Sequence, residues 1–547
     1  MFNIPKLQLL KKLNPKDKKG KYKAEFWLLL IVLFALALRL WFFVGLVYTD
    51  EQDEGIYLRT ALTTSEGRMD FSKYANLPKS FLPNPSEAFD FRTMVYYPPS
   101  IMFRLFGLNE FSAIFFSLVY SLLGIIVIFY IAKLFFNEKV GLLAAFLLSF
   151  FPLDVLFSTR LMPDIVVSFY MWLGMLLFFI AEKIKGNKSH WYKKNILLYF
   201  LSGLSFGLGY LAKISIFLVL ILFVAYFFYT RKVKFVQLFV LLGFLAVFIS
   251  EGLYFAASTG DFFLNYHISN GVYDNKIKYD NIDNINLIPN ILRIWYLDGS
   301  TQIFYLPTVL GILALRGEAL NSMNYFGLFY YLVFFSVAFL LCKKVKRSYL
   351  LVLSLISIFL YLELGPTFLR FFEHGSLINF LILKKARILM ALTTPALILV
   401  SLFLTKLKYK ISTMMILILF LSSLIAINTT RDFFVSGVSS IKEAANFLET
   451  QPDRSIYADH MAAGMLEVYL GNKKRISGFP SDETAIKDAY IVDYGSRGMD
   501  ISPQAIESIR PKYLRNATNE WMVVKVINNP SKKFAKNYKD LIIYSSK

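Results

Sequence analysis

Long runs of apolar residues, separated by short polar segments, cover most of this chain. A helix needs about 20 mostly apolar residues to cross about 30 Å of hydrocarbon, so the recurrence of such runs predicts a helical membrane protein. The runs predict about eleven transmembrane helices, near residues 26–47, 112–134, 141–157, 165–182, 196–212, 215–230, 235–256, 325–342, 348–364, 388–405 and 411–427.

Lys and Arg residues between the runs predict the orientation, because these residues are retained on the cytoplasmic side of a membrane. Residues 1–25 are basic, which places the N-terminus in the cytoplasm. The other basic segments agree with this orientation and lie at residues 183–194, 231–234, 343–347 and 406–410. An odd number of spans then places the final segment outside, together with the loops at residues 48–111, 257–324 and 365–387.

The chain changes character after the last run. Residues 428–547 are more polar and contain short β-rich stretches at 490–494 and 521–527. Residues 458–470 have the apolar spacing of a helix and are followed by Gly471, a suitable helix stop. We therefore predict three parts: a cytoplasmic segment (1–25), a transmembrane domain (26–427) and a small α/β domain outside the cell membrane (428–547). The fold class is mainly α, a multi-pass protein.

Composition supports the bilayer as the main solvent. Of 547 residues, 56% are hydrophobic and only 18% are charged, too few for an ordinary soluble surface. The formal net charge of +21 comes from basic segments between apolar runs, which favours anionic lipid and excludes nucleic acid as the partner. The single cysteine, Cys342, excludes an intrachain disulfide and a multi-thiolate metal site.

Two acidic positions on the predicted outer face are candidates for chemistry. The first outer loop opens with acids that include Asp53 and Glu54, and a helix starting there would place Asp53 and Tyr57 on one face. Farther along, Pro163 ends one helix and Asp164 starts the next. A solvated acidic loop and an ordinary Pro-Asp turn are the structural alternatives.

Together, two acids at one surface are suited to hold an acceptor hydroxyl or amine while one of them removes its proton. A divalent cation such as Mg²⁺ or Mn²⁺ could bridge Asp53 and Asp164. Basic residues on the predicted outer face complement these acids. Positive charge should be scarce on that face, yet Lys213 and Arg387 stand there. At that depth they suit the phosphate of a lipid carrier, or else they reach to phospholipid headgroups.

Five segments resemble the C-type membrane glycosyltransferases, specifically the branch of protein O-mannosyltransferases and aminoarabinose transferases. Residues 53–61 (DEGIYLRTA) are similar to the family's Asp-Glu, two residues, Tyr, three residues, Ala pattern. Residues 97–110 hold its Pro-Pro pair and its Phe-Gly-x-x-Glu segment. Residues 158–164 and 203–213 look like its Ser-Arg-x-x-Pro-Asp turn and its glycine-rich segment ending in Lys, and residues 387–395 like its late Arg-to-Pro stretch.

The resemblance covers about residues 26–427 and implies a polyprenyl-phosphate sugar as donor, with inversion at the sugar carbon and Asp53 as catalytic base. Glu54 would be a supporting acid, and Asp164 would orient the acceptor or a cation. Tyr97 stands where the aminoarabinose branch has Lys, and the nearest preceding basic residue is Arg92. The resemblance and the charge pattern give these candidates: for catalysis Asp53, Glu54 and Asp164; for donor phosphate Lys213, Arg387 and Arg92; for acceptor or donor contacts Tyr57, Tyr97 and Arg160.

The expected protein is therefore a glycosyltransferase of a prokaryotic cell membrane, acting outside on a protein, lipid or glycan acceptor. The main alternative is a transporter or lipid flippase, which needs charged residues inside its spans. A non-catalytic receptor that binds through residues 428–547 is the third possibility.

Overall fold

The computed structural model describes residues 23–46, 53–71, 91–184, 189–231, 233–268, 326–359, 389–458, 460–478, 488–493, 521–528 and 541–546. For Asp53 and residues 189–193 only the backbone is described. Arg387 and most of the predicted loops 257–324 and 365–387 lie outside the described residues.

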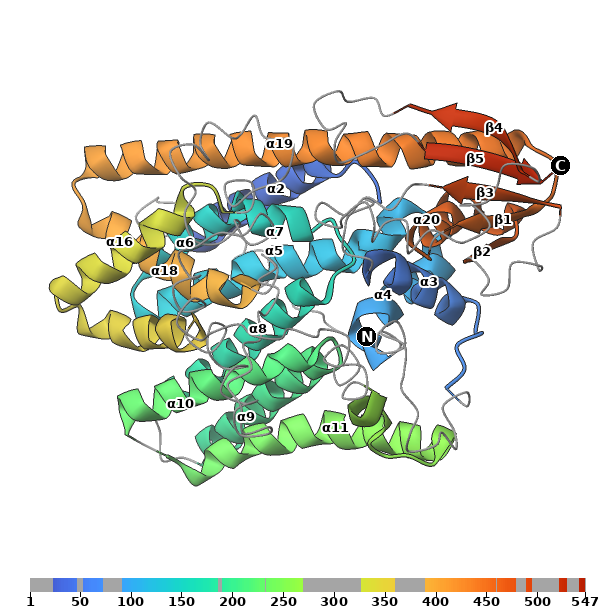
Figure 1. Cartoon of the computed structure of the whole chain (residues 1–547). Coiled ribbons are helices and arrows are strands. Elements are labelled where there is room, and N and C mark those ends of the chain that lie inside the picture. The colour runs from blue at the N-terminus through green and yellow to red at the C-terminus, as the bar shows by residue number, and fades with distance from the viewer. Residues whose placement is uncertain are drawn as a thin grey trace, which may run out of the picture.

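Most of the described chain is helical. Figure 1 shows a layer of roughly aligned helices at one end and a small sheet at the other. The helices of the first half are α2 (Ala24–Phe42), α3 (Asp53–Ser65), α4 (Thr93–Phe106), α5 (Glu110–Phe135), α6 (Glu138–Ser149), α7 (Pro152–Phe157), α8 (Pro163–Lys183), α9 (Ser189–Tyr210), α10 (Leu218–Thr230) and α11 (Leu238–Thr259). Those that follow are α16 (Phe329–Cys342), a helical segment at 349–359, α18 (Met390–Lys406), α19 (Tyr409–Thr450) and α20 (His460–Leu470).

Apolar composition makes these helices suited to a bilayer. Within the described ranges, five stretches are long and apolar enough to cross a membrane: Ala24–Phe42, Glu110–Phe135, Pro163–Lys183, Phe235–Thr259 and part of Tyr409–Thr450. Three shorter apolar helices accompany them, at Ile214–Thr230, Tyr331–Cys342 and Met390–Lys406. Exposed Leu side chains line α2, α11 and α19, together with Trp on α2 and Ile on α11 and α19, as expected of surfaces that face lipid.

The predicted span at 141–157 is wrong as a single helix. α6 ends at Ser149, and α7 begins at Pro152 after the extended residue Phe151. Proline has no backbone N–H to donate and fits the first position of a new helix, so it starts α7 and cannot continue α6. The apolar run hid this break because every residue in it except Asp154 and Ser149 is hydrophobic or small.

Close backbone contact holds two of the membrane helices together. A β-carbon on Gly203 of α9 would lie 1.9 Å from the carbonyl oxygen of Val240 in α11. Only glycine permits this approach, and α9 also packs along α8. The result fixes α9, which Lys213 follows, against its neighbours.

The C-terminal domain contains a five-stranded mixed sheet in the order β2-β1-β3-β5-β4. The strands are β1 (Ser455–Ala458), β2 (Ile476–Gly478), β3 (Ala489–Asp493), β4 (Trp521–Ile527) and β5 (Leu541–Ser546). β1 is parallel to β2 and β3, whereas β5 is antiparallel to β3 and β4. The predicted α/β character is confirmed, and α20 ends before Gly471 as predicted, with a positive φ of 58° at that glycine.

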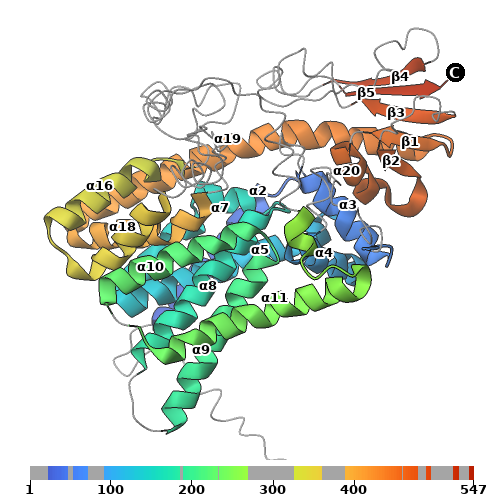
Figure 2. The same cartoon turned by 60° about the horizontal axis from the view of Figure 1, so that its bottom comes forward.

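α19 joins the two regions without a break. This 42-residue helix starts among the membrane helices and continues along the sheet, so the predicted boundary at residue 428 falls within it (Figure 1). Between the membrane helices and the sheet lie α3, α4 and α20, which Figure 2 shows in one group. α3, which begins at Asp53, packs against α4 on one side and α20 on the other.

Candidate active site

Glu54 connects the two acidic segments that the sequence singles out. Its side chain is only 1% exposed, and its Oε2 atom accepts hydrogen bonds from Arg160 Nε at 3.0 Å and Nη2 at 2.8 Å. Its Oε1 atom accepts a bond from the backbone N–H of Leu161 at 2.9 Å. A two-pronged guanidinium contact of this kind fixes both position and orientation. The first turn of α3 is therefore fastened to the turn that precedes Asp164.

Asp164 lies in the first turn of α8, directly after Pro163, as predicted. Its side chain is buried, and its Oδ1 atom accepts a hydrogen bond from Lys213 Nζ at 2.8 Å. Lys213 follows the end of α9, where its backbone N–H bonds to the carbonyl of Gly209 at 3.1 Å. The sequence placed these two residues in separate roles, and the structure joins them as an ion pair.

Arg92 and Tyr57 form a second contact near this position. Arg92 Nη1 donates a hydrogen bond to the hydroxyl of Tyr57, and the guanidinium carbon lies 5.8 Å from the centre of the tyrosine ring. The backbone N–H of Met94 donates to the carbonyl of Leu211 at 3.2 Å, which ties the start of α4 to the end of α9. Arg92 and Lys213, two of the predicted phosphate-binding residues, therefore each lie within two residues of this hydrogen bond between α4 and α9.

Two other predicted contacts have different surroundings. Tyr97 on α4 is 54% exposed, and Arg160 is buried against Glu54 and stacks over the ring of Phe434 on α19 at 5.2 Å. Arg160 therefore acts as a buried support for Glu54. Arg387 lies outside the described residues, but its neighbours can be followed: Ser168 Oγ donates to the carbonyl of Met390 and Trp172 Nε1 to that of Ala391, at 3.1 and 3.0 Å.

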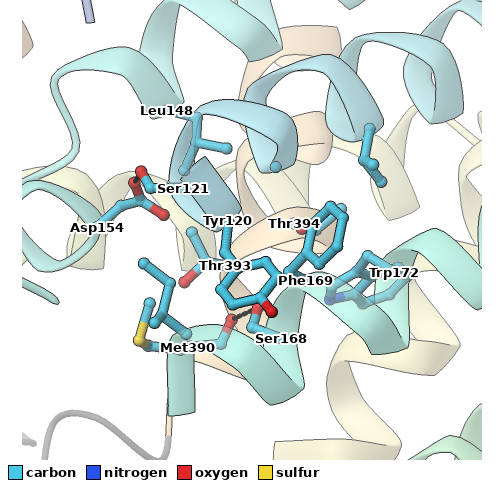
Figure 3. A pocket seen from close by; sticks show the side chains of 13 residues that line it. Tyr120, Ser121, Leu148, Asp154, Ser168, Phe169, Trp172, Met390, Thr393 and Thr394 are labelled. Atoms are coloured by element: carbon cyan, nitrogen blue, oxygen red, sulfur yellow. Dashed lines mark hydrogen bonds between the residues drawn. The ribbon is translucent and has the colours of Figure 1, made fainter. Parts of the chain in front are cut away.

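Those two bonds place the start of α18 against the first turns of α8, beside a small cavity of about 20 Å³. This is room for about one water molecule. Figure 3 shows its lining: Tyr120 and Ser121 of α5, Phe169 and Trp172 of α8, Thr393 and Thr394 of α18, and Asp154 of α7, whose carboxylate points toward Ser121. The cavity therefore carries polar groups between helices that are otherwise apolar.

Asp154 also pairs with Arg39, a cluster that the sequence analysis missed. Arg39 is fully buried and donates to Asp154 Oδ1 at 2.5 Å, Ser121 Oγ at 2.8 Å and the carbonyl of Ser149 at 2.9 Å. The last bond satisfies a carbonyl left open where α6 ends. The sequence did contain a signal for this pair: Arg39 and Asp154 each stand in a mostly apolar run, and an isolated charge is too costly to bury.

On its other face, α18 borders an apolar cavity of about 150 Å³. Phe, Leu, Val and Ile side chains of α16, the 349–359 helix and α18 line it, and Thr393 also lines the polar cavity. A metal site has less support here: among the described side chains, no group of three or more His, Cys, Asp or Glu residues gathers. A cation between Asp53 and Asp164 stays a prediction.

Comparison with known proteins agrees with the architecture. Residues 93–253 match the family model described as dolichyl-phosphate-mannose-protein mannosyltransferase. None of the curated proteins matches this chain in sequence. The matched segment contains Arg160, Asp164 and Lys213.

Two groups of solved structures have a similar fold. ArnT from Cupriavidus metallidurans bound to undecaprenyl phosphate is 13% identical with a TM-score of 0.56, and the alignment covers 95% of this chain and 98% of that one. The Archaeoglobus fulgidus oligosaccharyltransferase AglB, in complex with an inhibitory peptide and a dolichol-phosphate, is 12% identical with a TM-score of 0.50. That alignment covers 83% of this chain but only 65% of the oligosaccharyltransferase. These likenesses confirm the predicted C-type glycosyltransferase fold of an integral membrane protein.

Proposed function

We propose that this protein transfers a sugar from a polyprenyl-phosphate carrier to an acceptor at the outer face of the membrane, with Asp53 as the base. The observation that carries the proposal is the contact of Glu54 with Arg160 and Leu161. It joins the start of α3 to the turn before Asp164, so that the two acidic segments lie at one end of the helices. Lys213 adds a cation to the same place.

The chemistry follows from these charges. Asp53 removes the proton from an acceptor hydroxyl or amine, whose electron pair forms the new bond to the sugar carbon. The bond from that carbon to the phosphate oxygen breaks from the opposite side, which inverts the configuration, and the polyprenyl phosphate leaves with the electron pair. Lys213, Arg92 and Arg387 neutralise the phosphate charge that grows in this step.

Lys213 can serve the donor without releasing Asp164. An ammonium group has three N–H donors, of which one goes to Asp164, at 2.8 Å. In this proposal another N–H binds a phosphate oxygen, and Asp164 holds the ammonium in place. Because Lys213 would then bind both groups, the buried carboxylate of Asp164 can stand next to the proposed phosphate site.

The carrier needs an apolar site as well as a phosphate site. The 150 Å³ cavity next to α18 has the apolar lining that suits part of an isoprenoid chain. The solved relatives support a carrier of this class, since one is bound to undecaprenyl phosphate and another to a dolichol-phosphate. A protein, a lipid or a glycan remains open as the acceptor.

The test is transfer by Asp53→Asn in reconstituted vesicles, with Asp50→Asn as the matched control in the same loop. Loss of the carboxylate base should lower the rate by about 100-fold or more, while the control keeps its rate. The assay measures both the glycosylated acceptor and the polyprenyl phosphate released. Near-normal turnover by Asp53→Asn refutes the assignment, and sugar-lipid movement without release favours the transporter instead.

A further inference from the structure

α20 of the C-terminal domain approaches α3 at one glycine. Gly464 lies within the α20 helix, where glycine costs about 0.5–1 kcal/mol relative to alanine and so points to a packing requirement. A β-carbon at Gly464 would lie 2.7 Å from the carbonyl oxygen of Gly55. Gly55 is the second residue after Asp53, so the approach occurs at the first turn of α3. Only a hydrogen atom fits between the two helices at this point.

The two helices also meet one turn farther along. Arg59 Nε of α3 lies 3.5 Å from Glu467 Oε1 of α20, and the other carboxylate oxygen of Glu467 is buried without a hydrogen-bond partner among the described residues. Burial raises the pKa of Glu467 to about 7, against the opposing effect of Arg59. The Arg59–Glu467 pair is therefore a second, largely buried contact between α3 and α20.

The far end of α20 is anchored to the membrane helices. The hydroxyl of Tyr469 donates to Glu110 Oε1 at 2.5 Å, and Lys442 Nζ of α19 lies 2.9 Å from the same atom. Glu110 is the first residue of α5. Its carboxylate also accepts from the backbone N–H of Leu46 at 3.4 Å, and Lys442 donates to the carbonyl of Val44 at 3.3 Å. The contacts of α20 thus reach the chain both before and after Asp53.

We propose that α20 positions the first turn of α3, with Gly464 as the positioning residue, so that the C-terminal domain forms part of the active site. The inference rests on the proposed function, because Asp53 in that turn is the proposed base. An ordinary contact begins at 3.4 Å, so a methyl group at position 464 forces the helices apart by about 0.7 Å. Misplacement of a catalytic group by about 1 Å can lower a rate by about 100-fold.

The first measurement is steady-state transfer by the full-length Gly464→Ala protein in lipid nanodiscs. We expect kcat to fall by about 10- to 100-fold, whereas the donor KM stays within about threefold, because Lys213 lies on another element. Leu466→Ala is the matched control: Leu466 is also buried in α20, but helical geometry directs it about 200° away from Gly464. That variant should lower the unfolding temperature and keep kcat per folded molecule.

The second measurement does not depend on activity. Amide hydrogen exchange in residues 53–65 should accelerate in Gly464→Ala but not in Leu466→Ala, while exchange in α8 stays unchanged. Wild-type kcat together with wild-type exchange of α3 in Gly464→Ala overturns the proposal, as does an equal loss of kcat in both variants. If the wild-type chain transfers no sugar, the proposed function fails, and the exchange of α3 alone decides whether α20 positions it.

Discussion

Glu54 and Arg160 offer the sharpest test of how the candidate site is built. The pair is almost fully buried, with side chains 1% and 5% exposed, and the carboxylate accepts three hydrogen bonds. Breaking a buried ion pair by neutralising one partner costs about 3–5 kcal/mol, because the other charge stays in a medium of low polarity. Glu54→Gln keeps the shape and one acceptor oxygen, so we expect a loss of about 3 kcal/mol, or about 100-fold in the folded-to-unfolded ratio.

The assay is a double-mutant cycle measured by reversible unfolding in mixed detergent micelles. Glu54→Gln, Arg160→Met and the double variant are compared, and the double variant should be at least about 1 kcal/mol more stable than additivity requires. Glu66→Gln at the other end of α3 is the control, since its partner Arg68 is exposed and surface pairs contribute about 0–1 kcal/mol. Additive effects, or a loss in Glu54→Gln below about 0.5 kcal/mol, would refute the reasoning.

Three further outcomes are expected. Arg39→Met leaves Asp154 buried without its cation and should destabilise the chain by about 3 kcal/mol, whereas Arg39→Met with Asp154→Leu should recover at least half of that loss in the same unfolding assay. Lys213→Gln should raise the donor KM by about 10-fold or more in the transfer assay, and an unchanged KM would exclude Lys213 from phosphate binding. Because burial raises the pKa of Glu467 from 4.5 to about 7, its stabilising effect is complete below pH 4.5 and is lost as the pH rises through 7. Glu467→Gln should therefore flatten the unfolding temperature between these pH values, and an unaltered profile would contradict this.

Several local features could be predicted from the sequence because each depends on a few neighbouring residues. The start of α8 at Pro163 follows from the ring of proline, and the end of α20 before Gly471 from a left-handed residue that favours glycine. β4 occupies Trp521–Ile527, the stretch predicted from its β-branched and aromatic residues. The break between α6 and α7 is marked by Pro152 in the same local way, but the prediction followed the apolar run 141–157 as a whole and missed it.

The sequence predicted only part of the candidate site. Its residue types follow from charge against an apolar background together with the family resemblance, which select Glu54, Asp164 and Lys213. Their partners do not follow, because Glu54 and Arg160 are 106 positions apart and Asp164 and Lys213 are 49 apart. The charge pattern and the family resemblance assigned these residues to catalysis and to phosphate binding, whereas the structure shows that each is also held by an opposite charge.

By itself, the sequence determined that this protein is a bundle of membrane helices with a small α/β domain, because hydrophobicity acts on each segment separately through its transfer from water to lipid. Only the tertiary structure decided which charges neutralise one another, that α19 runs continuously between the two regions, and that α20 lies against α3 at Gly464. These features depend on distances between segments far apart in the chain. Such distances are set by the packing of all the helices together, which no local pattern of residues contains.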